Sequence, residues 1–358
     1  MPSLKEIKGR INSISSTLAI TSAMKMVAAA KLQKAQMAIQ NMLPYERRLH
    51  SMLIDLMGAM NISAAASEDG SVRGSGSAER GFDQSGDRLS LSNRHDLAGM
   101  DGAYSLMAQR EVRKVAIVAF ASNSSLCGAF NSNAIREATA VINEYRASGL
   151  GDADITVYSV GRKMAEAMKK LGFPSPADFT KMSDSPSYDA ASALAQELFD
   201  GFVSGRFDKV ELVYNHYKST SSQPTTRQTY LPLSLADATA DLQAGKITDP
   251  ASETDTNRVA EPVGAPVVRQ GSPTTEDLIV EPSKEALIAT LLPKVIRLRI
   301  FTTLLDSAAA EQAARTVAMQ LATDNGNDLL QELTLEYNKG RQQKITSEIL
   351  DLVGGSMQ

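Results

Sequence analysis

The chain has 358 residues, of which 43% are apolar and 22% are charged, and its formal net charge is −4. These values exclude a chain that is disordered throughout, and the balance of charge gives no general footprint for nucleic-acid binding. No apolar run approaches the roughly 18 residues of a transmembrane helix, and the charged N-terminus lacks the apolar core of a signal peptide. We therefore expect a cytosolic protein that begins at Met1.

Residues 1 to 62 predict one long amphipathic helix, roughly 85 Å in length at ~1.5 Å per residue. Apolar or small side chains recur in alternating steps of three and four, which is the spacing of a coiled-coil seam. The seam positions are Leu4, Ile7, Ile11, Ile14, Leu18, Thr21, Ala28, Leu32, Ala35, Ile39, Met42, Leu49, Leu53, Leu56 and Met60. Lys25 interrupts the seam, which resumes after Pro44. The basic residues of this helix form either a solvated face or a face opposed to acidic protein loops.

Two segments interrupt the periodic pattern and are predicted to be insertions. Residues 63 to 112 are rich in Gly, Ser and Asp, and residues 236 to 282 are rich in Pro, Thr and acidic residues. Such compositions cannot bury much apolar area, so we expect flexible excursions. The alternative is that residues 89 to 107 or 236 to 242 form a small helix packed on the rod.

Residues 113 to 235 have the pattern of a central α/β domain. Short apolar runs predict strands at 115–120, 155–160, 210–214 and 228–233, and amphipathic runs predict helices at 133–146, 162–171 and 188–203. Strands that alternate with helices indicate a mainly parallel sheet.

Residues 283 to 358 predict a second long helix, about 105 Å in length. No proline follows Pro293, and an apolar stripe continues to the end of the chain. The stripe contains Leu305, Ala309, Gln312, Met319, Leu330, Leu333 and Tyr337. Two such helices that flank one domain are expected to pair as an antiparallel coiled coil, with the longer C-terminal helix projecting beyond Met1.

Residues that could perform chemistry are scarce. The phosphate-binding pattern GxxxxGK[ST] does not occur, so the α/β domain carries no sequence sign of nucleotide binding. The three histidines are far apart, and no Cys/His cluster has metal-ligand spacing. Cys127 follows a predicted strand and precedes a helix, where it is either a nucleophile or a small buried thiol. We expect no catalytic residue, no cofactor and no metal.

Short segments spread along the chain match one known family. In chain order they are residues 11–14 (INSI), 20–29 (ITSAMKMVAA), 126–131 (LCGAFN), 223–225 (QPT), 231–233 (LPL), 311–315 (EQAAR), 322–325 (ATDN), 337–339 (YNK) and 345–348 (ITSE), followed by Asp351. In this order they closely resemble the gamma subunit of the rotary ATP synthase of the bacterial type. The resemblance covers nearly everything except the two insertions.

The resemblance implies partners and a location. The rod would lie inside a ring of alternating alpha and beta subunits, and the domain would rest on the membrane ring of c subunits beside the epsilon subunit, with one copy per complex and no nucleic acid. Arg341, Gln342 and Thr346 would hydrogen-bond a loop of one beta subunit. Met24 and Lys25 would be further contacts with a beta subunit. The implied location is peripheral, on the cytoplasmic face of the bacterial inner membrane.

The chain departs from the family pattern in places. Asn123-Ser124-Ser125 stands where the family often has Asp-Arg-Gly, which removes a charge pair and the contacts it would make. With Cys127 as its one cysteine, the chain lacks the dithiol switch of plant members. The insertion at 63 to 112 is unusual for the family.

Sequence pattern and resemblance together predict a non-catalytic rotor shaft, which couples a proton-driven or sodium-driven membrane ring to conformational change in catalytic subunits. Gln312, Thr316, Thr323 and Gly326 suit a rod surface that must release its contacts, and otherwise they are filler in a weak coiled coil. The alternatives are a static coiled-coil scaffold and a nucleotide-dependent α/β enzyme.

Overall fold

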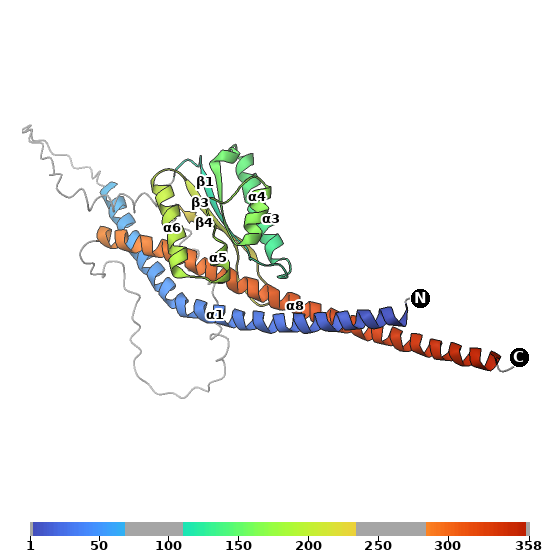
Figure 1. Cartoon of the computed structure of the whole chain (residues 1–358). Helices are drawn as coiled ribbons and strands as arrows, with labels where there is room; N and C mark the ends of the chain where they lie inside the picture. Colours follow the sequence, from blue (N-terminus) through green and yellow to red (C-terminus); the bar gives the residue numbers. More distant parts are fainter. Residues whose placement is uncertain (1–2, 69–109, 234–283, 356–358) are drawn as a thin grey trace, which may run out of the picture.

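The computed structural model describes residues 3 to 68, 110 to 233 and 284 to 355 (Figure 1). Two very long helices and a sheet with helices on both faces make up this part of the chain. Most of the two expected insertions, at 63 to 112 and 236 to 282, lies outside the described residues. The small helices considered at 89 to 107 and 236 to 242 lie outside them as well.

The two long helices form an antiparallel rod, as predicted. Helix α1 spans Leu4–Glu68 and helix α8 spans Lys284–Gly355. Thr323 on α8 donates a hydrogen bond of 3.2 Å to Thr21 on α1, and farther along the rod Gly340 lies against Leu4. Residues 341 to 355 of α8 therefore continue past the start of α1, and Figure 1 shows this end of α8 projecting beyond the N-terminus.

The predicted seam of α1 faces α8. Every predicted seam position from Leu4 to Leu53 is buried or half-buried, whereas most intervening positions are exposed. The helix continues through Pro44 and ends at Glu68, beyond the expected boundary at residue 62. Figure 1 shows a bend in α1, and a proline inside a helix is a usual cause because it removes one backbone donor. Among the described helices, none is long and apolar enough to cross a membrane.

The central domain carries a four-stranded sheet with strand order β2-β1-β3-β4. Its strands are β1 (Val115–Phe120), β2 (Ile155–Val160), β3 (Lys209–Asn215) and β4 (Thr225–Leu231). Strand β1 pairs in parallel with β2 and β3, and β4 returns antiparallel to β3. The expected mainly parallel sheet is confirmed. Strand β4 starts before the predicted residue 228 because its first residues are polar and give no apolar signal.

Helices cover both faces of the sheet. One face carries α3 (Phe130–Ala147) and α4 (Arg162–Lys170), and the other carries α5 (Thr180–Asp184), α6 (Tyr188–Val203) and the lower half of α8. The side chains of β1 alternate between these two buried clusters. This explains why β1 is a continuous apolar run, since both of its faces are covered. Helix α5 was not predicted because five residues are too few to show a helical period.

Gly161 terminates β2 in a backbone conformation that other residues rarely adopt. Its φ is +102°, and a Cβ at this position would lie 2.0 Å from the carbonyl oxygen of Ala121. Gly149 has a similar φ of +95°, but a Cβ there would meet nothing within 4 Å. Both glycines have a positive φ, but only at Gly161 would an added Cβ also clash with the backbone.

We predict that Gly161→Ala destabilises the protein much more than Gly149→Ala does. The second substitution carries only backbone strain, about 1–2 kcal/mol, whereas the first must also displace the strand end beside Ala121, for a total of roughly 4 kcal/mol. Urea unfolding of both variants and the wild type measures the difference. Equal losses in the two variants would contradict this account of the turn.

Candidate functional site

The upper end of α8 presents the three residues predicted to contact a partner. Arg341, Gln342 and Thr346 lie beyond the level of Leu4, and every residue from 341 to 350 is exposed. The Thr346 hydroxyl donates a hydrogen bond of 2.9 Å to the Gln342 carbonyl within the helix. That hydroxyl oxygen and the side chains of Arg341 and Gln342 remain open to solvent on a single helix.

Met24 and Lys25, the other predicted contacts, lie at a different height on the rod. Both are half-buried on α1, and the nearby Thr21 is level with Thr323 on α8. By helical rise this places them roughly 30 Å below Arg341. The structure therefore separates the five predicted residues into a tip set and a mid-rod set.

Two of the four residues expected on the releasing surface of the rod face inward instead. Thr323 bonds to Thr21 on α1, and Gly326 lies under Leu18, to which a Cβ on Gly326 would approach within 2.7 Å. These residues therefore belong to the seam between the helices. This agrees with the alternative prediction, in which they fill space in a weak coiled coil. Gly326 leaves the space that Leu18 occupies, and this close approach keeps the two backbones near each other.

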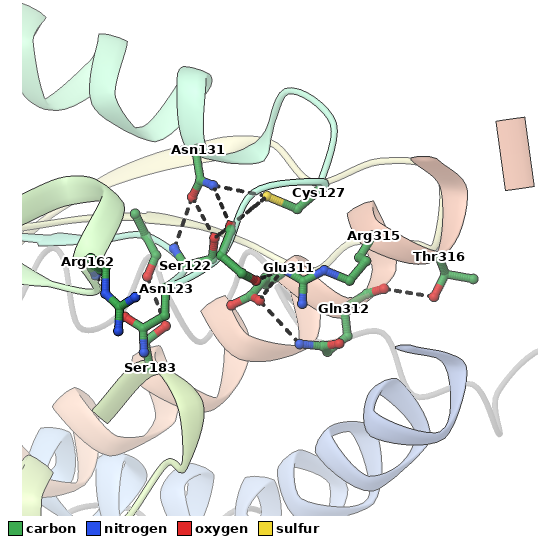
Figure 2. A network of polar contacts seen from close by, with 12 residues as sticks. Ser122, Asn123, Cys127, Asn131, Arg162, Ser183, Glu311, Gln312, Arg315 and Thr316 are labelled. Atoms are coloured by element: carbon green, nitrogen blue, oxygen red, sulfur yellow. Dashed lines mark hydrogen bonds and ion pairs between the residues drawn. The ribbon is translucent and has the colours of Figure 1, made fainter. Parts of the chain in front are cut away.

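A loop of the central domain holds α8 midway along its length (Figure 2). The Asn123 side chain accepts a hydrogen bond from the Arg162 backbone at 2.8 Å and donates one to the Thr180 carbonyl at 2.7 Å. The Ser124 hydroxyl accepts a hydrogen bond from Arg315 of α8 at 2.8 Å. The sequence Asn123-Ser124-Ser125 thus makes polar contacts of its own without the charge pair that the family often has there.

Arg315 joins this loop to a buried carboxylate. It lies 2.8 Å from Glu311, one turn earlier on α8, and both side chains are about one-tenth exposed. Burial raises the pKa of Glu311, and the positive charge of Arg315 opposes that rise. A cavity of about 10 Å³ beside Glu311 is also lined by Ser183 and Ser307. This space is the size of a water molecule and far smaller than a substrate pocket.

Cys127 is a buried thiol, in keeping with the simpler of the two expectations for it. It is 1% exposed, and the Asn131 amide donates a hydrogen bond of 3.1 Å to its sulfur. A nucleophile would need access to a substrate and an adjacent base. The polar neighbours of the sulfur in Figure 2 are serine groups of the same loop and the Asn131 amide at the start of α3.

Comparison with known proteins identifies the family. A family model described as ATP synthase matches residues 3 to 357. The ATP synthase gamma chain of Phocaeicola vulgatus is 47% identical over 357 residues, and that of Bacteroides thetaiotaomicron is 44% identical over 358 residues. Each alignment covers 100% of this chain and 100% of the relative. The chain belongs to the ATP synthase gamma chain family.

Membership in the gamma chain family has two immediate consequences. It makes this chain a non-catalytic subunit of the ATP synthase complex. The alignments also cover the whole of this chain and of both relatives. Segments in the positions of residues 63 to 112 and 236 to 282 are therefore present in these two gamma chains as well.

A solved structure has the same fold. A chain of the mitochondrial ATP synthase of Euglena gracilis superposes with a TM-score of 0.54 and 18% sequence identity. The match covers 99% of this chain and 93% of that chain. The long paired helices and the central α/β domain are therefore shared across a wide sequence distance.

Sequence reasoning missed the junction between the loop and α8. Glu311 and Arg315 are an acid and a base spaced four apart on a helix, so their pairing was detectable from the sequence. Their contact with Ser124 was not, because the two partners are 191 positions apart.

We predict that Arg315→Ala destabilises the protein by about 3–5 kcal/mol, because it leaves Glu311 buried without its partner. The pKa of Glu311 in the folded state then rises further, so the folded chain holds this proton more tightly than the unfolded chain does. The loss of stability should be smallest below the unfolded pKa of about 4.3 and grow as pH rises through the folded pKa.

Urea unfolding between acid and neutral pH checks this prediction. The matched control is the double variant Glu311→Gln with Arg315→Ala, which has no charge to desolvate at position 311. Relative to this double variant, the single variant should lose stability as pH rises, because only the single variant keeps a carboxyl group whose pKa is raised in the folded state. A loss that is identical at every pH in the single variant would contradict the role assigned to Glu311.

Proposed function

We propose that this chain is the central shaft of a rotary ATP synthase and that its projecting C-terminal helix reaches into the catalytic ring. The observation that carries the proposal is the length of α8 beyond α1. Residues 341 to 355 extend roughly 22 Å past the paired part of the rod as a single helix, of which residues 341 to 350 are exposed. A helix that needed only to pack on its own domain would not extend so far.

Exposed apolar side chains support a covered position for this tip. Ile345, Ile349 and Leu352 are spaced four and three apart, so they share one face of α8, and they are 47%, 54% and 75% exposed. A cluster of exposed apolar residues at the end of a rod indicates a surface that a partner covers.

The shape of the rod supplies a mechanism for coupling. A ring of three equivalent catalytic subunits would surround a pair of helices at one height and a single helix above it. Neither cross-section has threefold symmetry, so each subunit would face a different surface at a given shaft angle. Contacts that differ between subunits favour different conformations in them, and nucleotide binding in turn favours particular shaft angles. Rotation is this reciprocal linkage repeated in a cycle.

The proposed partners follow from this role. The rod contacts the alpha and beta subunits, and the central domain rests on the epsilon subunit and the membrane ring of c subunits, with one copy of the chain in each complex. The corresponding location is the cytoplasmic face of the bacterial inner membrane.

Within this arrangement the tip residues Arg341, Gln342 and Thr346 act as a catch on one beta subunit. They are exposed on one helix, and Gln342 and Thr346 are one turn apart, so all can reach a single loop. Met24 and Lys25 contact a beta subunit lower in the ring. The ammonium group of Lys25 suits an acidic loop there.

We predict that Arg341→Ala and Gln342→Ala each lower ATP hydrolysis and synthesis by about tenfold or more, since a charge-assisted hydrogen bond contributes roughly 1.5–3 kcal/mol. Thr346→Val tests the hydroxyl at nearly constant shape. The measurement is turnover of the assembled complex, with and without an opposing ion gradient. Arg113→Ala, at an exposed ion pair of the central domain, is the matched control and should turn over at the wild-type rate. Wild-type rates for all three tip variants would contradict the catch.

Direct observation of rotation tests the shaft role itself. A bead attached to the central domain of the immobilised complex should rotate when ATP is supplied. A static scaffold would hold the bead at a fixed angle while ATP is hydrolysed, and that result would overturn the proposal.

A further inference from the structure

The loop between β3 and β4, residues 216 to 224, contacts both helices of the rod. Asp306 on α8 receives two contacts from it: the His216 ring nitrogen Nδ1 lies 2.7 Å from one carboxylate oxygen, and the Tyr217 backbone N–H donates to the other at 2.9 Å. Gln36 on α1 donates a hydrogen bond of 2.7 Å to the Tyr217 hydroxyl. A single loop of the domain is thus bonded to α1 and α8 at the same height.

The Tyr217 ring lies where three parts of the molecule meet. It packs against two small buried clusters, one between the rod helices and one between α8 and the start of α3. Their buried members are Leu32, Ala309 and Ala313 in the first cluster and Cys127, Phe130 and Ala310 in the second. Tyr217 therefore touches α1, α8 and the β1–α3 loop through one side chain.

The loop itself is tied firmly to the sheet. His216 donates its backbone N–H to the Pro224 carbonyl at 2.9 Å, which closes the hairpin. At the end of β3, Asn215 donates to the Phe130 carbonyl and accepts from the Thr225 hydroxyl. A force on the loop is therefore passed to the sheet and to α3 as well as to the hairpin.

This loop is located where the rod leaves the domain. Above it, α8 still meets the domain through Arg315 and Ser124, but α1 continues with α8 as its partner through the contacts of Leu18 and Thr21. Apolar packing resists separation of the helices but is non-directional, so it opposes sliding and twisting only weakly. Hydrogen bonds have preferred directions and oppose both.

We propose that residues 216 to 224 form a collar, in which Tyr217 and Asp306 position α1 and α8 relative to the central domain and carry torque between the domain and the free part of the shaft. The inference rests on the proposed shaft function. Asp306 fixes α8 to the collar through a charged acceptor, and the Tyr217 hydroxyl fixes α1. Without these bonds the domain can turn through a larger angle before the tip follows.

The test uses the whole ATP synthase complex with three variants. Tyr217→Phe removes only the hydroxyl that bonds to Gln36, Tyr217→Ala also removes the ring, and Asp306→Ala removes the acceptor for His216 and the Tyr217 N–H. Ser221→Ala, on the exposed side of the same loop, is the matched control. The structural readout is hydrogen exchange of the Tyr217 amide, which should become about tenfold faster in Asp306→Ala because one charge-assisted hydrogen bond is lost.

The functional readout is rotor stiffness and loaded turnover. A bead on the central domain should show a wider angular distribution in Asp306→Ala and Tyr217→Ala complexes when the tip is held in the ring, with a smaller widening in Tyr217→Phe. ATP synthesis near the threshold ion gradient should fall severalfold, while ATP hydrolysis without load should stay near the wild-type rate. A variant that only lowered stability would reduce the amount of complex without changing stiffness in each complex that assembles.

Unchanged stiffness and unchanged loaded synthesis in Tyr217→Ala and Asp306→Ala would overturn the collar. If those two variants fail to assemble, Tyr217→Phe decides the question alone, because it deletes one oxygen atom: wild-type stiffness would refute the collar. Arg341→Ala run in parallel separates this failure from that of the shaft function. If Arg341→Ala slows turnover while the collar variants behave like the wild type, the collar is rejected and the shaft function stands. If the bead never rotates, the shaft function itself is rejected.

Discussion

The pairing of the apolar stripes of α1 and α8 is the interaction on which the rest of the structure depends. Neither helix could bury its stripe in a compact domain, because each is far longer than such a domain is wide. The same stripes also complete the domain, since Leu53 of α1 and Leu292 of α8 belong to the buried cluster beneath the sheet. The rod is therefore a continuous structural element that serves as core at one end and as free shaft at the other.

Burial along the rod decreases from the domain toward the tip. On α8, side chains from Ile288 to Met319 include many that are fully buried, whereas beyond residue 320 the seam positions are only half-buried. The seam there combines a threonine pair and a glycine with large apolar side chains of both helices, among which Ile7 is 3% exposed. The lower rod is held by a buried core, and the upper rod is held by a seam whose positions on α8 are half-buried.

The sequence predicted what depends on local periodicity. The strands at 115–120 and 155–160 follow from short apolar runs. The helix at 188–203 and the α1 seam follow from repeats of three and four residues, and the structure has all of them at those positions. The tip residues came from resemblance, because an exposed polar helix face has no pattern of its own.

Contacts between distant segments could not be predicted in this way. Thr323 and Gly326 looked like surface residues until the register with α1 was known, since a small or polar residue is compatible with either face of a helix. The partners of Tyr217 lie in α1, α8 and the β1–α3 loop, and no spacing in the sequence links them.

The facing of Leu4 and Gly340 has a consequence for biosynthesis. The first helix leaves the ribosome before its partner has been translated, and at about 5–20 residues per second the wait lasts roughly 20–70 seconds. During that time the apolar seam of α1 is not yet paired with α8, and its side chains are available for contacts with other chains or with chaperones. The upper part of the coiled coil can pair only when synthesis is nearly complete. This part of the shaft therefore folds last, although it contains the first residues to be translated.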